Sequence, residues 1–288
     1  MTNQPGLLHL LNDASSPYRD PLARLNWDSL DLDVWWLPPH ALSLAGVEEF
    51  ECLPVVTRRR LSHIEFAHLL ETGLWLESVF MRHLSRALDG LDTAVRSRYL
   101  HEIREKAGHS LMFLELMDRS GIRIPEAYRH RPLLSKVISE HVGIDSALFW
   151  GLAMICEELT DKLNRAVRHA VDNAPVSAVI YHIATLRIMD EARHIALARA
   201  TFSDASQRLL GWQRLLKSPV LATLFRAFTR YLYFPPSVIY QTAGFDCPRV
   251  WRKRALANPV RQRLVERAVK PTLDFLRDQG WHIRAVHG

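Results

Sequence analysis

Cysteine is scarce in this sequence of 288 residues, and its scarcity argues against a secreted, disulfide-stabilised protein. Cys52, Cys156 and Cys247 are odd in number and lack metal-like spacing, so we expect a reducing cytoplasm. The amino terminus lacks a basic region followed by an apolar one, so we expect no signal peptide. The most apolar window, 147–156, is too short to span a bilayer, which predicts a soluble protein without a membrane partner.

Several functional motifs are also missing. The sequence contains no glycine-rich phosphate loop, nucleophile elbow, Cys-x-x-Cys pair or internal repeat. The net charge of +6 comes from basic residues scattered among acidic ones, with local clusters only at 58–60 and 249–254. Nucleic-acid binding is therefore not expected, although the charge leaves an acidic carrier protein open as a partner.

The most informative segment is Asp190-Glu191-Ala192-Arg193-His194, which lies within a long helical pattern. Residues three and four apart share a helix face, so Glu191 and His194 can point at one metal ion. An imperfect partner precedes it, Glu105-Lys106-Ala107-Gly108-His109, in which Lys106 replaces the expected glutamate. Two such helices, each joined by a glutamate from another helix, are typical of carboxylate-bridged metal sites in four-helix bundles.

Cap and stop residues predict four long helices. They are expected over 62–89, 93–120, 145–172 and 177–202, with caps at Ser62, Thr93, Asp145 and Ser177 and stops at Gly90 and Gly121. Residues 1–55 read as an irregular arm, and 203–288 as an extension of shorter helices. The prediction is one all-α domain over 1–288, with its four-helix core at 62–202.

Distance from the turns selects the remaining ligands. In antiparallel helices, residues equally far from the connecting turn lie at the same height, which places Glu77 level with 105–106 and Glu158 level with Glu191. Glu71 lies too far along the axis. Carboxylates with one imidazole per metal favour iron or manganese over zinc.

Other polar residues fit an ordinary structural role better. His63, His68, His83 and His101 lack matched partners, and each is expected to be a packing or solvated histidine. Glu157 is expected at the surface or behind the ligands, and Asp161 and Asp190 are expected to support the ligands. A bundle without a metal, in which all these acids are structural, is the alternative interpretation.

With these residues in place, the chain resembles the AurF-like di-iron oxygenases, a ferritin-like family named for an aminobenzoate N-oxygenase. The similar segments are Leu61-Ser62-x-x-Glu65, Trp75-Leu76-Glu77, His109-Ser110-Leu111-Met112-Phe113, Glu157-Glu158-x-x-Asp161, Asp190 to His194, Phe234-Pro235-Pro236 and Asn258-Pro259. The resemblance implies a ferritin-like bundle with two irons that activates dioxygen, commonly to oxidise an amine in specialised metabolism.

The family pattern implies metal ligands at the following positions of this chain: Glu77, His109, Glu158, Glu191 and His194. Two positions depart from the pattern, because Lys106 stands where the family has a bridging glutamate and Arg187 where it usually has a further histidine. Glu105 could replace the missing glutamate, since it also lies near the face of His109. Alternatively, both cations pair with carboxylates, and the site holds one metal or none.

The expected function is a di-iron oxygenase that takes electrons from an external donor and oxidises a small organic substrate, most simply an amine. Manganese or a single metal ion could take the place of the two irons, and a homodimer is open. Two alternatives stand beside this hypothesis: a metal-poor, non-catalytic bundle with a binding or scaffolding role, and a hydroxylase or desaturase that acts on a carrier-bound acyl chain.

Overall fold

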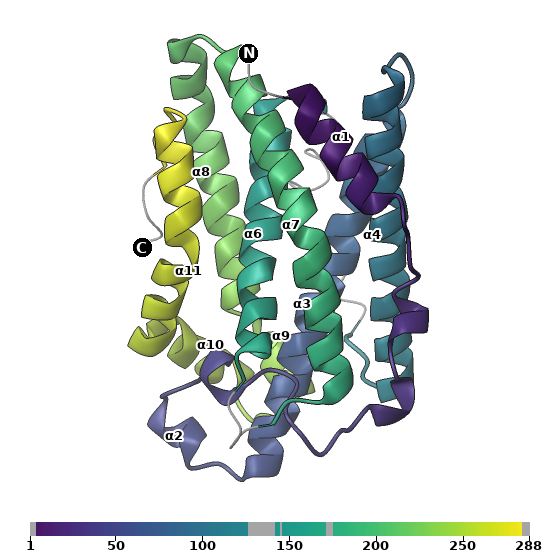
Figure 1. The fold of residues 1–288 in the computed structure, drawn as a ribbon. Coiled ribbons are helices and arrows are strands. Elements are labelled where there is room, and N and C mark those ends of the chain that lie inside the picture. Colours follow the sequence, from purple (N-terminus) through teal and green to yellow (C-terminus); the bar gives the residue numbers. More distant parts are fainter. Residues whose placement is uncertain (1–3, 126–141, 145, 171–174, 284–288) are drawn as a thin grey trace.

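Long helices running up and down the molecule form the protein (Figure 1). The structure is a computed structural model that describes residues 4–125, 142–144, 146–170 and 175–283. Within these ranges the chain forms helices and no strand, with one isolated bridge between Trp35 and Val176. The predicted all-α, ferritin-like fold class is confirmed.

The first two core helices form an antiparallel hairpin, as predicted. Helix α3 spans Val55–Arg86 and packs along α4, which spans Thr93–Ser120. The cap of α4 is Asp92 and not the expected Thr93, because the Asp92 carboxylate accepts from the backbone N–H groups of Ala94 and Val95 at 2.9 and 3.0 Å. Gly121 ends the helix in the left-handed conformation, with φ of 65°.

The expected start of the first helix at Ser62 was wrong. Helix α3 begins at Val55, and the buried Ser62 hydroxyl accepts hydrogen bonds from the backbone N–H groups of Trp36 and Leu37 at 2.8 and 3.0 Å. A serine that satisfies the backbone of a distant segment looks like a helix cap in the sequence. Its real role is to fix the N-terminal arm against the bundle.

The second hairpin consists of α6, Ala147–Arg168, and α7, Ala178–Gln207, which pack along their whole shared length (Figure 1). Ser146 caps α6 by accepting from the Leu148 N–H, while the expected cap at Asp145 and end at 172 lie outside the described residues. Helix α7 continues beyond the predicted end at 202, because Ser206 is buried and its hydroxyl accepts from the Trp281 indole at 3.0 Å.

The arm expected to be irregular contains a helix. Helix α1, Gln4–Ser15, lies across α4, and short helical turns follow at Leu22–Arg24, Trp27–Ser29 and Pro39–Ala41 before α2, Glu48–Glu51. The buried Arg98 of α4 donates to the Leu11 carbonyl and the Ser15 hydroxyl, both at 2.8 Å. Gly108 also lies under the arm, where a Cβ atom would come within 2.5 Å of the Tyr18 hydroxyl.

The C-terminal extension is more substantial than predicted. Helices α8, Gly211–Tyr233, and α11, Pro259–Asp278, are about as long as α6, the shortest core helix, and both pack on it. Between them, α9, Ser237–Thr242, and α10, Pro248–Ala257, lie near one end of the bundle (Figure 1). Asn258 caps α11 before Pro259, as the sequence indicated, and its side chain accepts from the Val260 N–H at 3.0 Å. The extension therefore buries the outer face of α6.

Among the helices in the described ranges, none is both long and apolar enough to cross a membrane. The interior is instead a mixture of apolar side chains and many buried charged groups, which gather where α3, α4, α6 and α7 meet.

Replacing Arg98 by leucine is expected to destabilise the protein by about 3 kcal/mol, because it leaves the buried Glu102 carboxylate without the guanidinium 2.6 Å away. Urea unfolding followed by circular dichroism measures the change. Arg96→Leu, at an exposed position of the same helix, is the control and should change stability by less than about 0.5 kcal/mol. Equal stabilities of the two variants would contradict this role of Arg98.

Candidate metal centre

A cluster of buried charged side chains lies at the centre of the four core helices. Each of its members is at most 6% exposed. Helix α3 supplies Glu77, α4 supplies Glu102, Glu105, Lys106 and His109, α6 supplies Glu157, and α7 supplies Arg187, Glu191 and His194. The two hairpins therefore bring together most of the residues that the sequence selected.

His109 is held at both ring nitrogens. Its Nε2 lies 2.9 Å from Oδ2 of Asp190, and its Nδ1 lies 2.9 Å from Nη1 of Arg187. Because a guanidinium only donates, Nδ1 accepts and the imidazole proton resides on Nε2, directed at Asp190. Burial alone would raise the pKa of Asp190, but the hydrogen bond with His109 and the nearby Arg193 lower it. Asp190 thus lies behind His109 in hydrogen-bond contact with its ring.

His194 has a matching arrangement with one difference. Its Nε2 lies 2.9 Å from Oε2 of Glu105 and 3.2 Å from Oε2 of Glu102, so the proton of this nitrogen is directed at carboxylates. Among the described residues its buried Nδ1 has no hydrogen-bond partner, and Oε2 of Glu191 lies 3.9 Å away. A carboxylate behind one histidine nitrogen and a free lone pair on the other is the arrangement found in metal-ligating histidines.

Arg187 lies on the His109 side of the cluster. Its Nη1 is 2.6 Å from Oε1 of Glu77, and its Nη2 contacts Oε1 of Glu191. The guanidinium carbon lies 5.2 Å from the centre of the Phe113 ring. Burial would lower the pKa of Arg187, but Glu191 and Glu77 raise it. The side chain therefore remains a cation.

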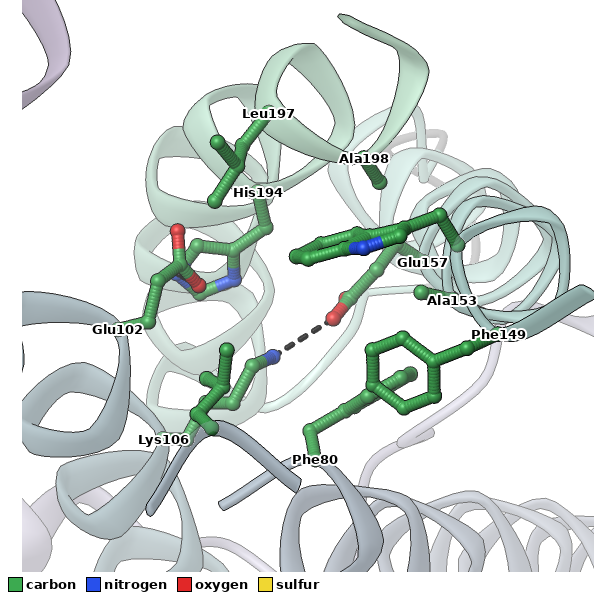
Figure 2. Close-up of a pocket in the computed structure, with 11 residues that line it drawn as sticks. Phe80, Glu102, Lys106, Phe149, Ala153, Glu157, His194, Leu197 and Ala198 are labelled. Atoms are coloured by element: carbon green, nitrogen blue, oxygen red, sulfur yellow. Dashed lines mark hydrogen bonds and ion pairs between the residues drawn. The ribbon is translucent and has the colours of Figure 1, made fainter. Parts of the chain in front are cut away.

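Lys106 links the two hairpins. Its Nζ lies 2.7 Å from Oε1 of Glu157 on α6 and 3.0 Å from Oε2 of Glu77 on α3. Figure 2 shows the contact with Glu157 beside the Phe80 ring, whose centre is 4.8 Å from the ammonium. Although burial would lower the pKa of Lys106, the two carboxylates raise it. Burial alone would raise the pKa of Glu77, but Lys106, His109 and Arg187 hold this pKa well below its usual range.

Two groups of donor atoms among the described residues have metal-like geometry, with atoms within 4.8 Å of one another: Glu77, His109 and Glu191, and Glu157, Glu191 and His194. The first does not fit a metal ion, because Arg187 contacts all three of its members. The second fits better, because the buried Nδ1 of His194 has no hydrogen-bond partner among the described residues and lies 3.9 Å from Glu191, whose carboxyl group contacts that of Glu157. The site thus suits one ion, and the two-iron set does not fit.

The structure corrects the choice between Glu157 and Glu158. The carboxylate of Glu158 points away from the cluster to the Nε of Arg199 and the hydroxyl of Thr272 on α11. Turn distance gives height along a helix, and adjacent residues differ mainly in the face they occupy. The face could have been recognised, because Glu157 continues the inward spacing of Trp150 and Ala153, which line the same cavity.

Three further acidic residues lie in positions that the sequence did not indicate. Asp161 forms an ion pair with Arg165 of its own helix at 2.6 Å, and not with a histidine. Glu105 contacts His194 and Arg193, so it lies behind a histidine and does not replace the glutamate missing at Lys106. Glu102 was overlooked, although it precedes Lys106 by one helical turn and so shares its face.

A small cavity and a surface hollow flank the cluster on different sides. The cavity, of about 20 Å³, has aromatic walls from Phe80, Phe149 and Trp150 and reaches Glu157 and His194 (Figure 2). This volume holds roughly one water molecule. The hollow, of about 220 Å³, lies beside the N-terminal arm and reaches Glu105 and Asp190. Arg193 bridges these two acids at 3.1 and 2.7 Å.

The four histidines set aside as structural have ordinary partners. His63 and His68 contact backbone carbonyls at 2.8 and 3.0 Å, and His83 contacts the Val79 and Val142 carbonyls. His101 lies 3.0 Å from Arg104.

Comparison with known proteins identifies relatives and a family of this chain. The chain is 23% identical over 245 residues to uncharacterized proteins of Mycobacterium bovis and of Mycobacterium tuberculosis, covering 83% of this chain and 70% of each relative. Over residues 6–280 it matches the family described as P-aminobenzoate N-oxygenase AurF. This family is an oxygenase family with two irons, and the match spans nearly the whole chain. The chain therefore belongs to the AurF family.

Proposed function

We propose that this protein is a metal-dependent oxidoreductase that uses dioxygen to oxidise a small organic substrate. Membership of the AurF family supports the reaction class. The observation that carries the metal is the buried Nδ1 of His194, which has no hydrogen-bond partner among the described residues and lies beside the carboxyl group of Glu191. A buried polar atom without a partner is costly, and a cation bound between these atoms removes that cost.

The proposed ligands are Glu157, Glu191 and His194, and the preferred ions are iron or manganese. Carboxylate oxygens with one imidazole nitrogen suit these ions, and bound iron would pass electrons from an external donor to dioxygen. Burial raises the pKa of Glu191, so that without a metal this carboxyl group favours its protonated form. Binding a cation would displace that proton.

The surrounding residues orient the ligands and give protons a route to solvent. Glu105 holds the ring of His194 through Nε2, and Asp190 does the same for His109. Both acids line the surface hollow, so protons on these nitrogens can exchange with water there. The aromatic cavity on the other side keeps the proposed ligands in a dry environment.

The substrate class is a proposal that rests on the family. N-oxygenation of an amine, with electrons from an external donor, is the reaction we propose. The cavity beside Glu157 admits a molecule the size of water or dioxygen. An organic amine would reach the site only if side chains such as Phe80 or Trp150 moved, so we expect substrate binding to open this cavity.

One observation favours a second candidate, a metal-poor bundle with a binding role. Lys106 and Arg187 already neutralise part of the carboxylate cluster by direct ion pairs. In this alternative the cluster is structural, since paired buried charges need no metal ion. Metal content separates the two candidates.

Protein expressed in iron-replete medium is expected to contain about one iron or manganese ion per chain, measured by inductively coupled plasma mass spectrometry. His194→Ala should remove most of the metal, because it deletes the only proposed nitrogen ligand. His182→Ala, an exposed histidine on the same helix, is the control and should retain it. Metal-free wild-type protein would reject the proposal and favour the structural bundle.

The two adjacent glutamates of α6 should behave differently. Glu157→Gln is expected to weaken manganese binding by about 100-fold or more, because it removes a proposed ligand charge. Glu158→Gln should leave the affinity within about threefold while lowering the thermal stability, because it disturbs the pairing with Arg199 and Thr272. Isothermal titration calorimetry measures the affinities and thermal unfolding the stability, and the reverse order of affinities would restore Glu158 as the ligand.

A further inference from the structure

We infer that Arg187 takes the position of a second metal ion, so that this bundle binds one divalent cation where its family binds two irons. The inference rests on the proposed function in one respect, that the cluster binds a metal at all. Its basis is that His109 and His194 differ in what surrounds their Nδ1 atoms.

The two histidines have the same support but different partners. Both direct Nε2 at carboxylates, Asp190 for His109 and Glu105 for His194, and both direct Nδ1 towards the cluster. At His109 the Nδ1 lone pair accepts from Arg187, whereas at His194 it accepts from no group in the part of the chain that the structure describes. One nitrogen of the pair is therefore satisfied by a guanidinium, and the other remains available for an ion.

Arg187 satisfies the whole donor group on the His109 side. Its two terminal nitrogens contact Glu77, His109 and Glu191, which are the three members of the first metal-like group. A metal ion placed among these atoms would overlap the guanidinium and would also be repelled by its charge. The planar guanidinium of arginine binds carboxylates well, so Arg187 stabilises this donor group in place of a metal ion.

Lys106, at the centre of the cluster, also disfavours a second metal ion. A glutamate here would offer the cluster another negative ligand, but this chain presents an ammonium between Glu77 and Glu157. The Nζ contacts Oε1 of Glu157. The second oxygen of this carboxylate is not engaged by that contact, so Glu157 can still be a ligand on the His194 side.

The charges of the connected network favour one divalent ion. With every carboxyl group ionised, as metal binding requires, and both histidines neutral, six carboxylates exceed the four permanent cations linked to them by two negative charges: Glu77, Glu102, Glu105, Glu157, Asp190 and Glu191 against Arg98, Lys106, Arg187 and Arg193. One divalent cation neutralises this excess, whereas two would leave the buried network positive. Buried charge without compensation is strongly unfavourable.

The first test uses the wild-type protein, stripped of metal with a chelator and titrated with Mn²⁺. The expected endpoint is about one ion per chain, with the electron paramagnetic resonance signal of an isolated Mn²⁺ ion. Two ions per chain with a spin-coupled signal would overturn the inference and leave the proposed function intact. No bound manganese or iron would instead reject the proposed function.

The second test restores the two departing positions together, as Lys106→Glu with Arg187→His. This double variant removes the guanidinium from the first group and adds a carboxylate, so the stoichiometry should rise to about two ions and the signal should become spin-coupled. Lys217→Glu with Arg226→His makes the same charge change on α8, away from the cluster, and should stay at about one ion.

Circular dichroism and the thermal midpoint establish whether the double variant folds. If the double variant does not fold, the titration of the wild-type protein decides between one ion and two. A folded double variant that still binds one ion, like the control, would overturn the assignment of Arg187 to the second metal position. A rise in the control as large as in the double variant would also overturn it, because net charge alone would then explain the effect.

Discussion

Charge balance in the bundle interior is the constraint on which the rest of this structure depends. Carboxylates from α3, α4, α6 and α7 converge in a space from which water is largely excluded. Each would cost several kcal/mol if it were ionised there without a partner. Arg98, Lys106, Arg187 and Arg193 supply the partners. Their interhelical ion pairs connect both hairpins, and a hydrogen bond from Arg98 to the Leu11 carbonyl connects the N-terminal arm. The same network that holds the helices together therefore also determines how many metal ions the site can take.

The arm and the C-terminal extension both follow from this arrangement. The arm is hydrogen-bonded to Arg98 and lies beside Glu105 and Asp190, the acids that contact the two histidines. Helix α11 provides Thr272, whose hydroxyl donates to Glu158, the glutamate of α6 that points away from the cluster. Each covers a buried charged group that would otherwise face solvent or an apolar side chain. The protein thus has the AurF-family bundle, and Lys106 and Arg187 place two cations among the carboxylates at its centre.

Sequence reasoning predicted the helices and the hairpins well, because cap residues, glycine stops and helical spacing are local signals. It also selected Glu77, His109, Glu191 and His194, which the structure brings into one cluster. It chose Glu158 over Glu157 because turn distance cannot resolve the face of a helix. It misread Ser62 as a cap because the partner of its hydroxyl, the backbone of 36–37, is distant in sequence. Long-range contacts of this kind leave no local pattern.

The departures at Lys106 and Arg187 were visible in the sequence, but their geometry was not. Sequence alone left open whether Lys106 turns aside and Glu105 takes its place. The structure instead places the ammonium between two carboxylates and Glu105 behind His194. The most direct test of this account is a crystal structure of the manganese-soaked protein with anomalous diffraction data. We expect one anomalous peak among Glu157, Glu191 and His194 Nδ1, with Arg187 still against His109; a second peak in the position of the guanidinium, or no peak in the cluster, would contradict it.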